Sequence, residues 1–152
     1  MPIIKTLKNG QWTPVNSVTS LGTATTTTAG LMSASDKEKL DNVTEYSTTE
    51  QVIGTWIDGK PIYRKCLNTG TLPNNNTMSV NHGISDFAFA TNIYGYVIDT
   101  SDNTRIPLPY PATTATSSIG IWVSDTAVRI NTGKDRTNCS GVIVLEYTKT
   151  TD

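Results

Sequence analysis

The chain has 152 residues, enough for one globular domain of about 100 residues and an extension, and its low charged fraction of 16% beside many Thr, Ser, Asn and Gly residues is typical of β structure with many turns. The formal net charge of -1 gives no electrostatic footprint, so we expect neither nucleic acid nor an anionic membrane as a partner. The longest apolar run, Val142 to Leu145, is far below the roughly 18 residues of a membrane span, and Met1 to Lys5 lacks the long apolar core of a secretory signal.

The first predicted element is a short hairpin near the N-terminus. Ile3 to Leu7 is a short alternating piece, and Asn9-Gly10 separates it from Trp12. Asn-Gly is preferred in two-residue hairpin turns because both residues tolerate positive φ. The pattern therefore predicts two short strands joined at Asn9-Gly10.

The threonine tract Thr23 to Thr28 forms the second feature of the N-terminal part. It offers β-branched side chains without a large apolar group, so it cannot supply the core of a monomer. We predict a strand there that wraps around identical neighbouring chains.

A short helix is predicted next. Ser33 or Ser35 can serve as its N-cap, because each is followed three residues later by an acid, Asp36 or Glu38, which is the spacing of a capping box. A helix of roughly ten residues lies below the length of about 12 to 15 at which isolated helices become marginal in water. Its apolar neighbours must therefore be buried against something else, and these are Leu31, Met32, Leu40 and Val43. We expect another copy of the segment as the partner; the alternative is the chain's own globular domain.

The clearest predicted hairpin lies in the second part of the chain. Val52 to Ile57 and Ile62 to Leu67 flank Asp58-Gly59, a preferred pair for tight hairpin turns. Alternation would place Val52, Gly54 and Trp56 on one face. Both Trp56 and Trp122 are expected to pack in the core.

Further short strands separated by turns predict the fold class. A polar loop is expected over Asn68 to Asn76, and Pro107 forces its strand to be an edge or to leave the sheet. The remaining predicted strands are Thr77–Val80, Asp86–Ala90, Ile93–Asp99, Thr104–Leu108, Ile119–Val123, Ala127–Ile130 and Gly141–Thr148. Seven or eight such strands without a long helical period predict a mostly β protein with an antiparallel β-sandwich, jelly-roll-like, after a short strand and helix stalk.

Catalytic and metal-binding ingredients are sparse. His82 is the single histidine, and no nucleophile elbow surrounds a serine, so His82 is predicted to be structural or on the surface. Cys66 and Cys139 lack CxxC spacing and are predicted to be reduced, partly buried thiols. We expect no metal and no cofactor, and a solvated turn at Lys134 to Arg136. The carboxylates that a glycosidase would need lie mostly in predicted turns, and they are Asp58, Asp86, Asp99, Asp102, Asp125, Asp135 and Glu146.

One set of aromatic and polar residues is a candidate for sugar binding. An aromatic ring can stack on a pyranose while short polar side chains bond its hydroxyls, although the same residues also cap ordinary sheets. The predicted ligand-binding residues are Tyr94, Tyr96, Asp102, Asn103 and Tyr110.

Two segments resemble known proteins. The string AGLMSASDKEKLD, residues 29 to 41, resembles the "GLMSAxDKxKLD" segment of bacteriophage fibre, tail and head-appendage proteins, where it follows a Thr/Ala-rich strand in a trimeric stalk or neck. GTWIDGKPIYRK at residues 54 to 65 and EYTKTTD at residues 146 to 152 are similar to signatures of the terminal head domain in fibre-like proteins from phages of Gram-positive gut bacteria.

The resemblance implies a virion protein in two parts. Residues 1–45 would be an N-terminal attachment region and trimeric neck, with Leu31, Met32, Leu40 and Val43 at the trimer interface, and residues 46–152 a β-sandwich head. The implied partners are two further copies of the chain, another virion protein of the tail, baseplate or capsid, and cell-surface polysaccharide of the host. The alternatives are a capsid head fibre or decoration protein, a secreted carbohydrate-binding module and a polysaccharide depolymerase.

Overall fold

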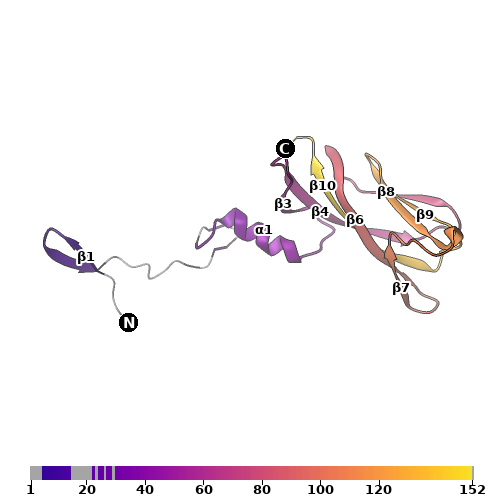
Figure 1. Ribbon diagram of the computed structural model, residues 1–152, viewed down its shortest axis with the longest axis horizontal. Helices are drawn as coiled ribbons and strands as arrows, with labels where there is room; N and C mark the ends of the chain where they lie inside the picture. The colour runs from indigo at the N-terminus through magenta and orange to yellow at the C-terminus, as the bar shows by residue number, and fades with distance from the viewer. Residues whose placement is uncertain (1–4, 15–21, 23, 26, 29, 152) are drawn as a thin grey trace. The chain divides into compact units, whose positions relative to one another are not determined.

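The structure is a computed structural model that describes residues 5–14, 22, 24–25, 27–28 and 30–151 (Figure 1). The chain divides into two compact units, residues 1–41 and residues 42–152. The predictions for Ile3, Ile4, Thr23 and Thr26 lie outside the described residues.

The N-terminal hairpin is confirmed for its described part. Strand β1 (Lys5–Lys8) pairs antiparallel with β2 (Gln11–Pro14). Asn9 and Gly10 have φ angles of 53° and 77°, as the two central residues of a type I′ turn require. Local turn chemistry alone therefore accounts for this element.

In the single chain, the described residues between Thr23 and Thr28 form a local turn, and a strand that wraps around identical neighbouring chains stays a prediction. The Thr25 hydroxyl accepts hydrogen bonds from the backbone N–H groups of Thr27 and Thr28, at 3.3 and 3.0 Å, and Thr25 N–H donates to the carbonyl of Thr28. A threonine hydroxyl competes with a strand ladder for backbone groups, and here the local bonds form instead.

Helix α1 (Ala34–Thr44) begins where the sequence predicts. Ser33 is its N-cap, because the Ser33 hydroxyl oxygen accepts a hydrogen bond from Asp36 N–H at 3.1 Å. The hydroxyl also donates to the Asp36 carboxylate at 2.7 Å, so the acid supports the cap through the serine side chain. Two ion pairs, Lys37 with Asp41 and Lys39 with Asp36, lie along the helix surface and add little stability.

The second unit, called the head here, contains two antiparallel sheets, which confirms a mostly β, sandwich-like fold. The first sheet has the strand order β3 (Gln51–Thr55), β4 (Pro61–Thr71), β10 (Cys139–Lys149), β6 (Phe87–Asp99) and β7 (Thr104–Leu108). The second sheet has the order β5 (Thr77–Asn81), β9 (Ala127–Thr132) and β8 (Ile119–Val123), and a 3-10 turn over Ala115–Ser117 precedes β8. The Pro-containing strand β7 is an edge, as predicted.

The core lies between the two sheets, and alternate residues of the strands point into it. On β10, Ile143, Leu145 and Tyr147 are fully buried in the core cluster, whereas Val144 and Glu146 belong to the opposite face. The second sheet contributes Val128 and Ile130 of β9. The opposite face of the five-stranded sheet is called the outer face below.

The hairpin of β3 and β4 is confirmed, but its predicted alternation is wrong. The ladder shifts register between Val52 and Gly54, so Ile53 is a bulge and the residues after it change faces. The turn runs over residues 56 to 60: Trp56 N–H donates to Lys60 C=O at 2.7 Å, and the Asp58 carboxylate accepts from Lys60 N–H at 3.0 Å.

Strands β4 and β6 are longer than predicted, because each continues through a β-bulge at a polar residue. The loop expected from Asn68 begins only after Thr71, since Thr69 bulges out of the ladder with β10 and its hydroxyl accepts from Gly141 N–H at 2.9 Å. Similarly, β6 is one strand, because Thr91 is the extra residue between the pairs Glu146 with Asn92 and Tyr147 with Ala90.

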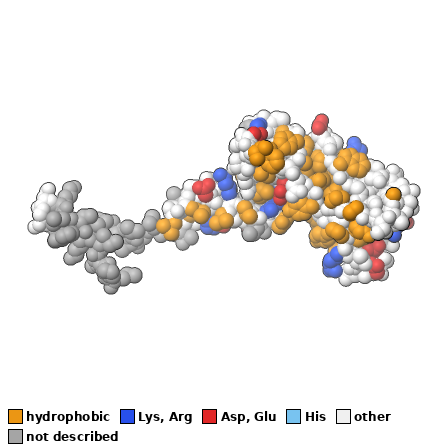
Figure 2. All heavy atoms as spheres, in the orientation of Figure 1, with side chains coloured by type: hydrophobic (Ala, Val, Ile, Leu, Met, Phe, Trp, Pro, Cys, Tyr) orange, Lys and Arg blue, Asp and Glu red, His pale blue; other side chains and the backbone are white. Residues whose placement is uncertain are grey.

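Neither Trp56 nor Trp122 belongs to the core, where both were predicted. Trp122 is 47% exposed on β8, while Trp56 is half-buried and packs edge-on against Phe89 with ring centres 5.9 Å apart. Hydrophobic side chains accordingly appear on the surface of the head in Figure 2. The core is built mainly of aliphatic side chains and Tyr147, so it leaves Trp122 outside.

Candidate ligand-binding groove

The five predicted ligand-binding residues separate into two places. Tyr94 and Tyr96 line a groove with a volume of about 510 Å³ on the outer face. Asp102 and Tyr110 line a different pocket of about 340 Å³, and Asn103 lines neither of these two hollows. The structure therefore does not bring the predicted set together.

The floor of the groove follows from the register of the five-stranded sheet. Tyr94 of β6 lies opposite Val144 of β10, and Tyr96 opposite Val142. On the other side of β10, Val144 lies opposite Cys66 of β4 and Val142 opposite Asn68. One row across the sheet is therefore Cys66, Val144 and Tyr94, and the next row is Asn68, Val142 and Tyr96. Strict alternation along each strand keeps both rows on the outer face.

The wall of the groove is the segment Tyr46 to Thr48, which was not predicted to be part of a site. Its backbone lies along β4, where Cys66 N–H donates to Ser47 C=O at 2.8 Å. The Tyr46 side chain reaches β6, and its hydroxyl lies 3.3 Å from the Tyr94 hydroxyl. Sequence spacing gives no signal for this contact, because the two tyrosines are 48 residues apart.

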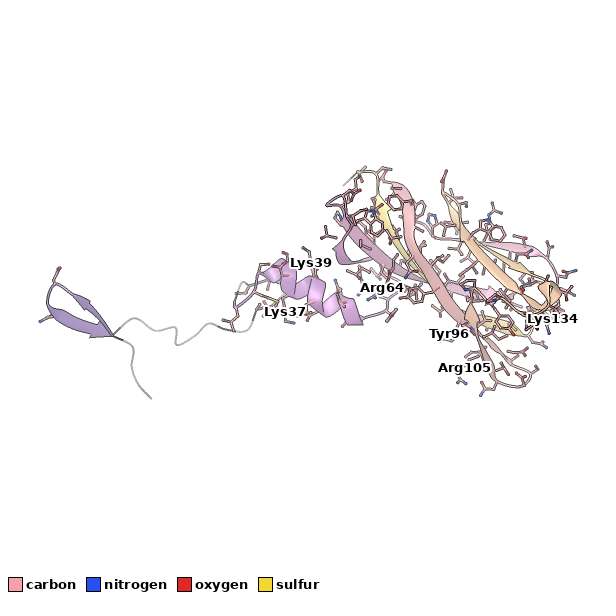
Figure 3. All side chains as sticks on the ribbon, in the orientation of Figure 1. Lys37, Lys39, Arg64, Tyr96, Arg105 and Lys134 are labelled. Atoms are coloured by element: carbon pink, nitrogen blue, oxygen red, sulfur yellow. The ribbon has the colours of Figure 1, made fainter. Side chains whose placement is uncertain are left out.

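Arg64, labelled in Figure 3, fixes the chain just before this wall. It is buried, and one guanidinium nitrogen donates to the carbonyls of Asn42 at 2.6 Å and Val43 at 3.0 Å and also to the carbonyl of Glu45. The guanidinium carbon lies 4.3 Å from the centre of the Tyr46 ring, within the range of a cation–π contact. Arg64 thus holds the backbone just before the wall and the Tyr46 side chain of the wall.

The tyrosine hydroxyls form a polar strip beside the groove. Tyr94 OH donates to the Glu146 carboxylate at 3.5 Å, and the Asn92 amide donates to the same carboxylate at 3.5 Å. Burial raises the pKa of Tyr94, and the hydrogen bond with Tyr46 and the negative charge of Glu146 raise it further. Tyr94 therefore keeps its proton at neutral pH, while the ring of Tyr96 remains 47% exposed.

The two thiols are free, as predicted, and both are buried. Burial raises the pKa of Cys66, which lies in the groove floor. Burial and the charge of Asp99 likewise raise the pKa of Cys139. A raised pKa lowers the thiolate fraction, so neither cysteine has the properties of a nucleophile.

Two side chains that line the second pocket, Asp102 and Arg136, already make structural hydrogen bonds. The Asp102 carboxylate accepts from Thr104 N–H at 2.9 Å, as expected of Asp in a turn. Arg136 is buried, so the predicted solvated turn is wrong at that residue; it donates to Ser117 C=O at 2.8 Å. The guanidinium carbon of Arg136 also lies 6.0 Å from the Tyr110 ring centre. These partners leave the pocket less free to bind a ligand.

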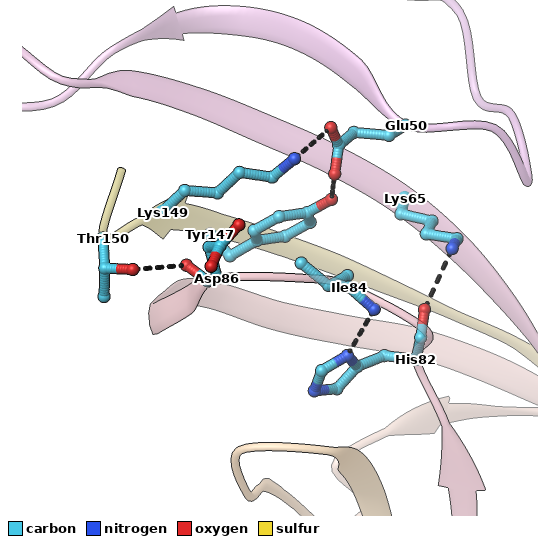
Figure 4. A network of polar contacts seen from close by, with 8 residues as sticks. All are labelled: Glu50, Lys65, His82, Ile84, Asp86, Tyr147, Lys149 and Thr150. Atoms are coloured by element: carbon cyan, nitrogen blue, oxygen red, sulfur yellow. Dashed lines mark hydrogen bonds and ion pairs between the residues drawn. The ribbon is translucent and has the colours of Figure 1, made fainter. Parts of the chain in front are cut away.

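His82 is buried and fully engaged in structural contacts (Figure 4). Its Nδ1 accepts from Ile84 N–H at 3.1 Å, which makes Nε2 the donor to Ser124 C=O at 3.3 Å. Its own carbonyl accepts from Lys65 Nζ at 2.9 Å. Within the described part of the chain, no group of three His, Cys, Asp or Glu side chains is placed to hold a metal ion.

Comparison of the chain with models of protein families, with curated proteins and with solved structures finds no match in any of the three. Of the helices in the described residues, none has the length and apolar character needed to cross a membrane.

Proposed function

We propose that the chain is a non-enzymatic structural protein of a bacteriophage virion, a homotrimeric fibre or appendage with a jelly-roll-like head that attaches the particle to a host-cell surface. The class of protein is suggested by the resemblance of residues 29–41, 54–65 and 146–152 to phage fibre proteins. Another virion protein would hold the N-terminal part.

Assembly is supported by apolar side chains that the single chain leaves exposed. Leu31, just before helix α1, is 78% exposed, and Leu40, within the helix, is 55% exposed. The helix is too short to be stable alone. Met32 and Val43 are exposed as well. Burial of these four side chains between three copies would remove that apolar surface from water.

The proposed adhesion is supported by the groove on the outer face. It combines an exposed aromatic ring, that of Tyr96, with hydroxyl and amide groups from Tyr94 and Asn68. Three copies on one fibre would turn weak single sites into strong attachment through effective concentration. The structural bonds of His82 and of the turn carboxylates supply no comparable argument for catalysis.

Light scattering on the purified full chain and gold-labelled antibodies on intact particles test this proposal. We expect a trimer at micromolar concentration, label on the tail or baseplate, and inhibition of particle adsorption by the free protein. Label on the capsid would instead identify a head fibre or decoration protein. A monomer that is absent from particles would contradict the proposal and favour a secreted carbohydrate-binding module.

A further inference from the structure

We infer that the outer-face groove binds one uncharged sugar ring stacked on Tyr96, and that the segment Tyr46 to Thr48 completes the site because Arg64 holds it in place. This inference rests on the proposed function and goes beyond it by giving the ligand its charge class, its stacking partner and a positioning residue.

The shape and chemistry of the groove suit a pyranose. Its volume of about 510 Å³ lies within the range of roughly 300 to 1,000 Å³ that is typical of small-molecule sites. The exposed ring of Tyr96 offers a π face with partial negative charge to the C–H face of a sugar. The exposed side chains of Asn68 and Thr48 and the hydroxyl-bearing side chain of Tyr94 line the same groove. They can bond the hydroxyls at the rim of a stacked sugar.

The charges around the groove indicate a neutral ligand. None of the side chains that line the groove is charged. Two charged groups near the groove already have partners: Arg64 donates to the backbone carbonyls before Tyr46, and Glu146 accepts from Tyr94 and Asn92. A phosphate or carboxylate in the groove would lose water without gaining a counter-charge, which is unfavourable.

Arg64 is a positioning residue for this site. It does not line the groove, yet it donates to Glu45 C=O, directly before the wall. A second residue of β4, Cys66, donates its backbone N–H to Ser47 C=O within the wall. The Arg64 guanidinium also lies against the Tyr46 ring. Lysine keeps the charge but not the planar guanidinium that lies against the Tyr46 ring, so Arg64→Lys should loosen the wall while leaving the floor intact.

Saturation-transfer NMR on the full-length protein tests the ligand class. The neutral probes are the methyl glycosides of glucose, galactose, rhamnose and N-acetylglucosamine, and the charged probes are glucuronic acid and glycerol phosphate. We expect transfer to the ring protons of at least one neutral glycoside, lost in Tyr96→Ala and kept in Tyr96→Phe. The matched control Tyr110→Ala, in the other pocket, should bind as the unmodified protein does. Absence of any neutral binding at millimolar concentration, binding of charged probes alone, or binding that survives Tyr96→Ala would overturn the inference.

A double-mutant cycle tests the role of Arg64. We expect Tyr46→Ala and Arg64→Lys each to weaken glycoside binding at least threefold, and the double variant to bind no more weakly than Tyr46→Ala. Independent, additive losses would overturn the positioning role, because a merely structural residue would not act through Tyr46. Particles that carry the chain and adsorb without any glycoside binding would refute this inference alone. Glycoside binding by a chain absent from particles would refute the proposed function alone.

Discussion

The guanidinium carbon of Arg64 lies 4.3 Å from the centre of the Tyr46 ring, on the outer face of the head. The same guanidinium donates to three backbone carbonyls between Asn42 and Glu45, so one buried side chain fixes the start of the head. Arginine is suited to this position because one terminal nitrogen of its guanidinium donates to the carbonyls while the guanidinium plane lies against the ring.

Arg64→Ala should therefore lower the free energy of unfolding by about 3 kcal/mol, since hydrogen bonds to a charged donor are lost and the carbonyls are left without it. Urea denaturation at a fixed protomer concentration measures this difference. Arg105→Ala is the matched control on strand β7, where the side chain is exposed and a change of less than about 0.5 kcal/mol is expected. Equal effects of the two substitutions would show that Arg64 has no special role.

Features that depend on neighbours in the sequence were predictable. Asn9 and Gly10 specify their own turn through positive φ, and Ser33 caps a helix whose first turn contains Asp36. The ends of strands β4 and β6 were less predictable, because the polar residues Thr69 and Thr91 are bulges in the pairing with β10. A bulge is decided by the partner strand, which the local pattern does not reveal.

The candidate site was only half predictable for the same reason. Tyr94 and Tyr96 attract attention by their alternation around Gly95, and the structure does place both in one groove. Tyr46 joins them through a contact that spans 48 positions, and Asn68 was assigned to a loop. Tyr110 was predicted to join this site, but it follows strand β7 and lines the second pocket instead.

The apolar side chains around helix α1 can be tested by charge. Replacing both Leu31 and Leu40 by Asp would place uncompensated carboxylates in the proposed trimer interface, where burial costs several kcal/mol for each charge. We expect the double variant to be a monomer by light scattering at micromolar concentration. Glu38→Lys, on the exposed surface of the same helix, should remain a trimer. A trimeric double variant of unchanged thermal stability would exclude these leucines from the interface.

The contact between β6 and β10 requires two glycines. A Cβ atom at Gly95 would overlap the carbonyl oxygen of Val142, and one at Gly141 would overlap that of Tyr96. Both obstacles are backbone atoms of a central strand pair, so neither can move without disturbing the ladder.

Gly95→Ala and Gly141→Ala should each destabilise the head by about 1–3 kcal/mol, the usual cost of overpacking. Gly120→Ala in β8 is the control, because the nearest atom to its Cβ would be the Trp122 ring at 3.9 Å, an ordinary contact. Thermal denaturation should rank Gly120→Ala closest to the unmodified protein. A reversed order would mean that the two central strands can separate at little cost.

Alkaline pH should destabilise the head through Tyr147. This side chain is fully buried, and its hydroxyl donates to the Glu50 carboxylate, which also pairs with Lys149 at 2.5 Å (Figure 4). Burial raises the pKa of Tyr147, and the hydrogen bond to Glu50 and the charge of that carboxylate raise it further. Below the unfolded tyrosine pKa of about 10, both states keep the proton and the contribution of Tyr147 is constant. Above it, the unfolded chain releases the proton while the folded chain retains it, so stability falls as pH rises.

The loss from Tyr147 should approach about 1.4 kcal/mol for each pH unit above 10, until the raised folded pKa is reached. Chemical denaturation at several pH values between 8 and about 12 measures the slope. Tyr147→Phe should flatten it while lowering stability at neutral pH, because Glu50 loses its hydroxyl partner. Glu50→Gln should narrow the pH range over which stability falls, because the charge that opposes ionisation is gone and the folded pKa of Tyr147 is raised less. If Tyr147→Phe keeps the slope of the unmodified protein, another group governs alkaline unfolding, and the raised pKa of Tyr94 makes Tyr94→Phe the next variant to measure.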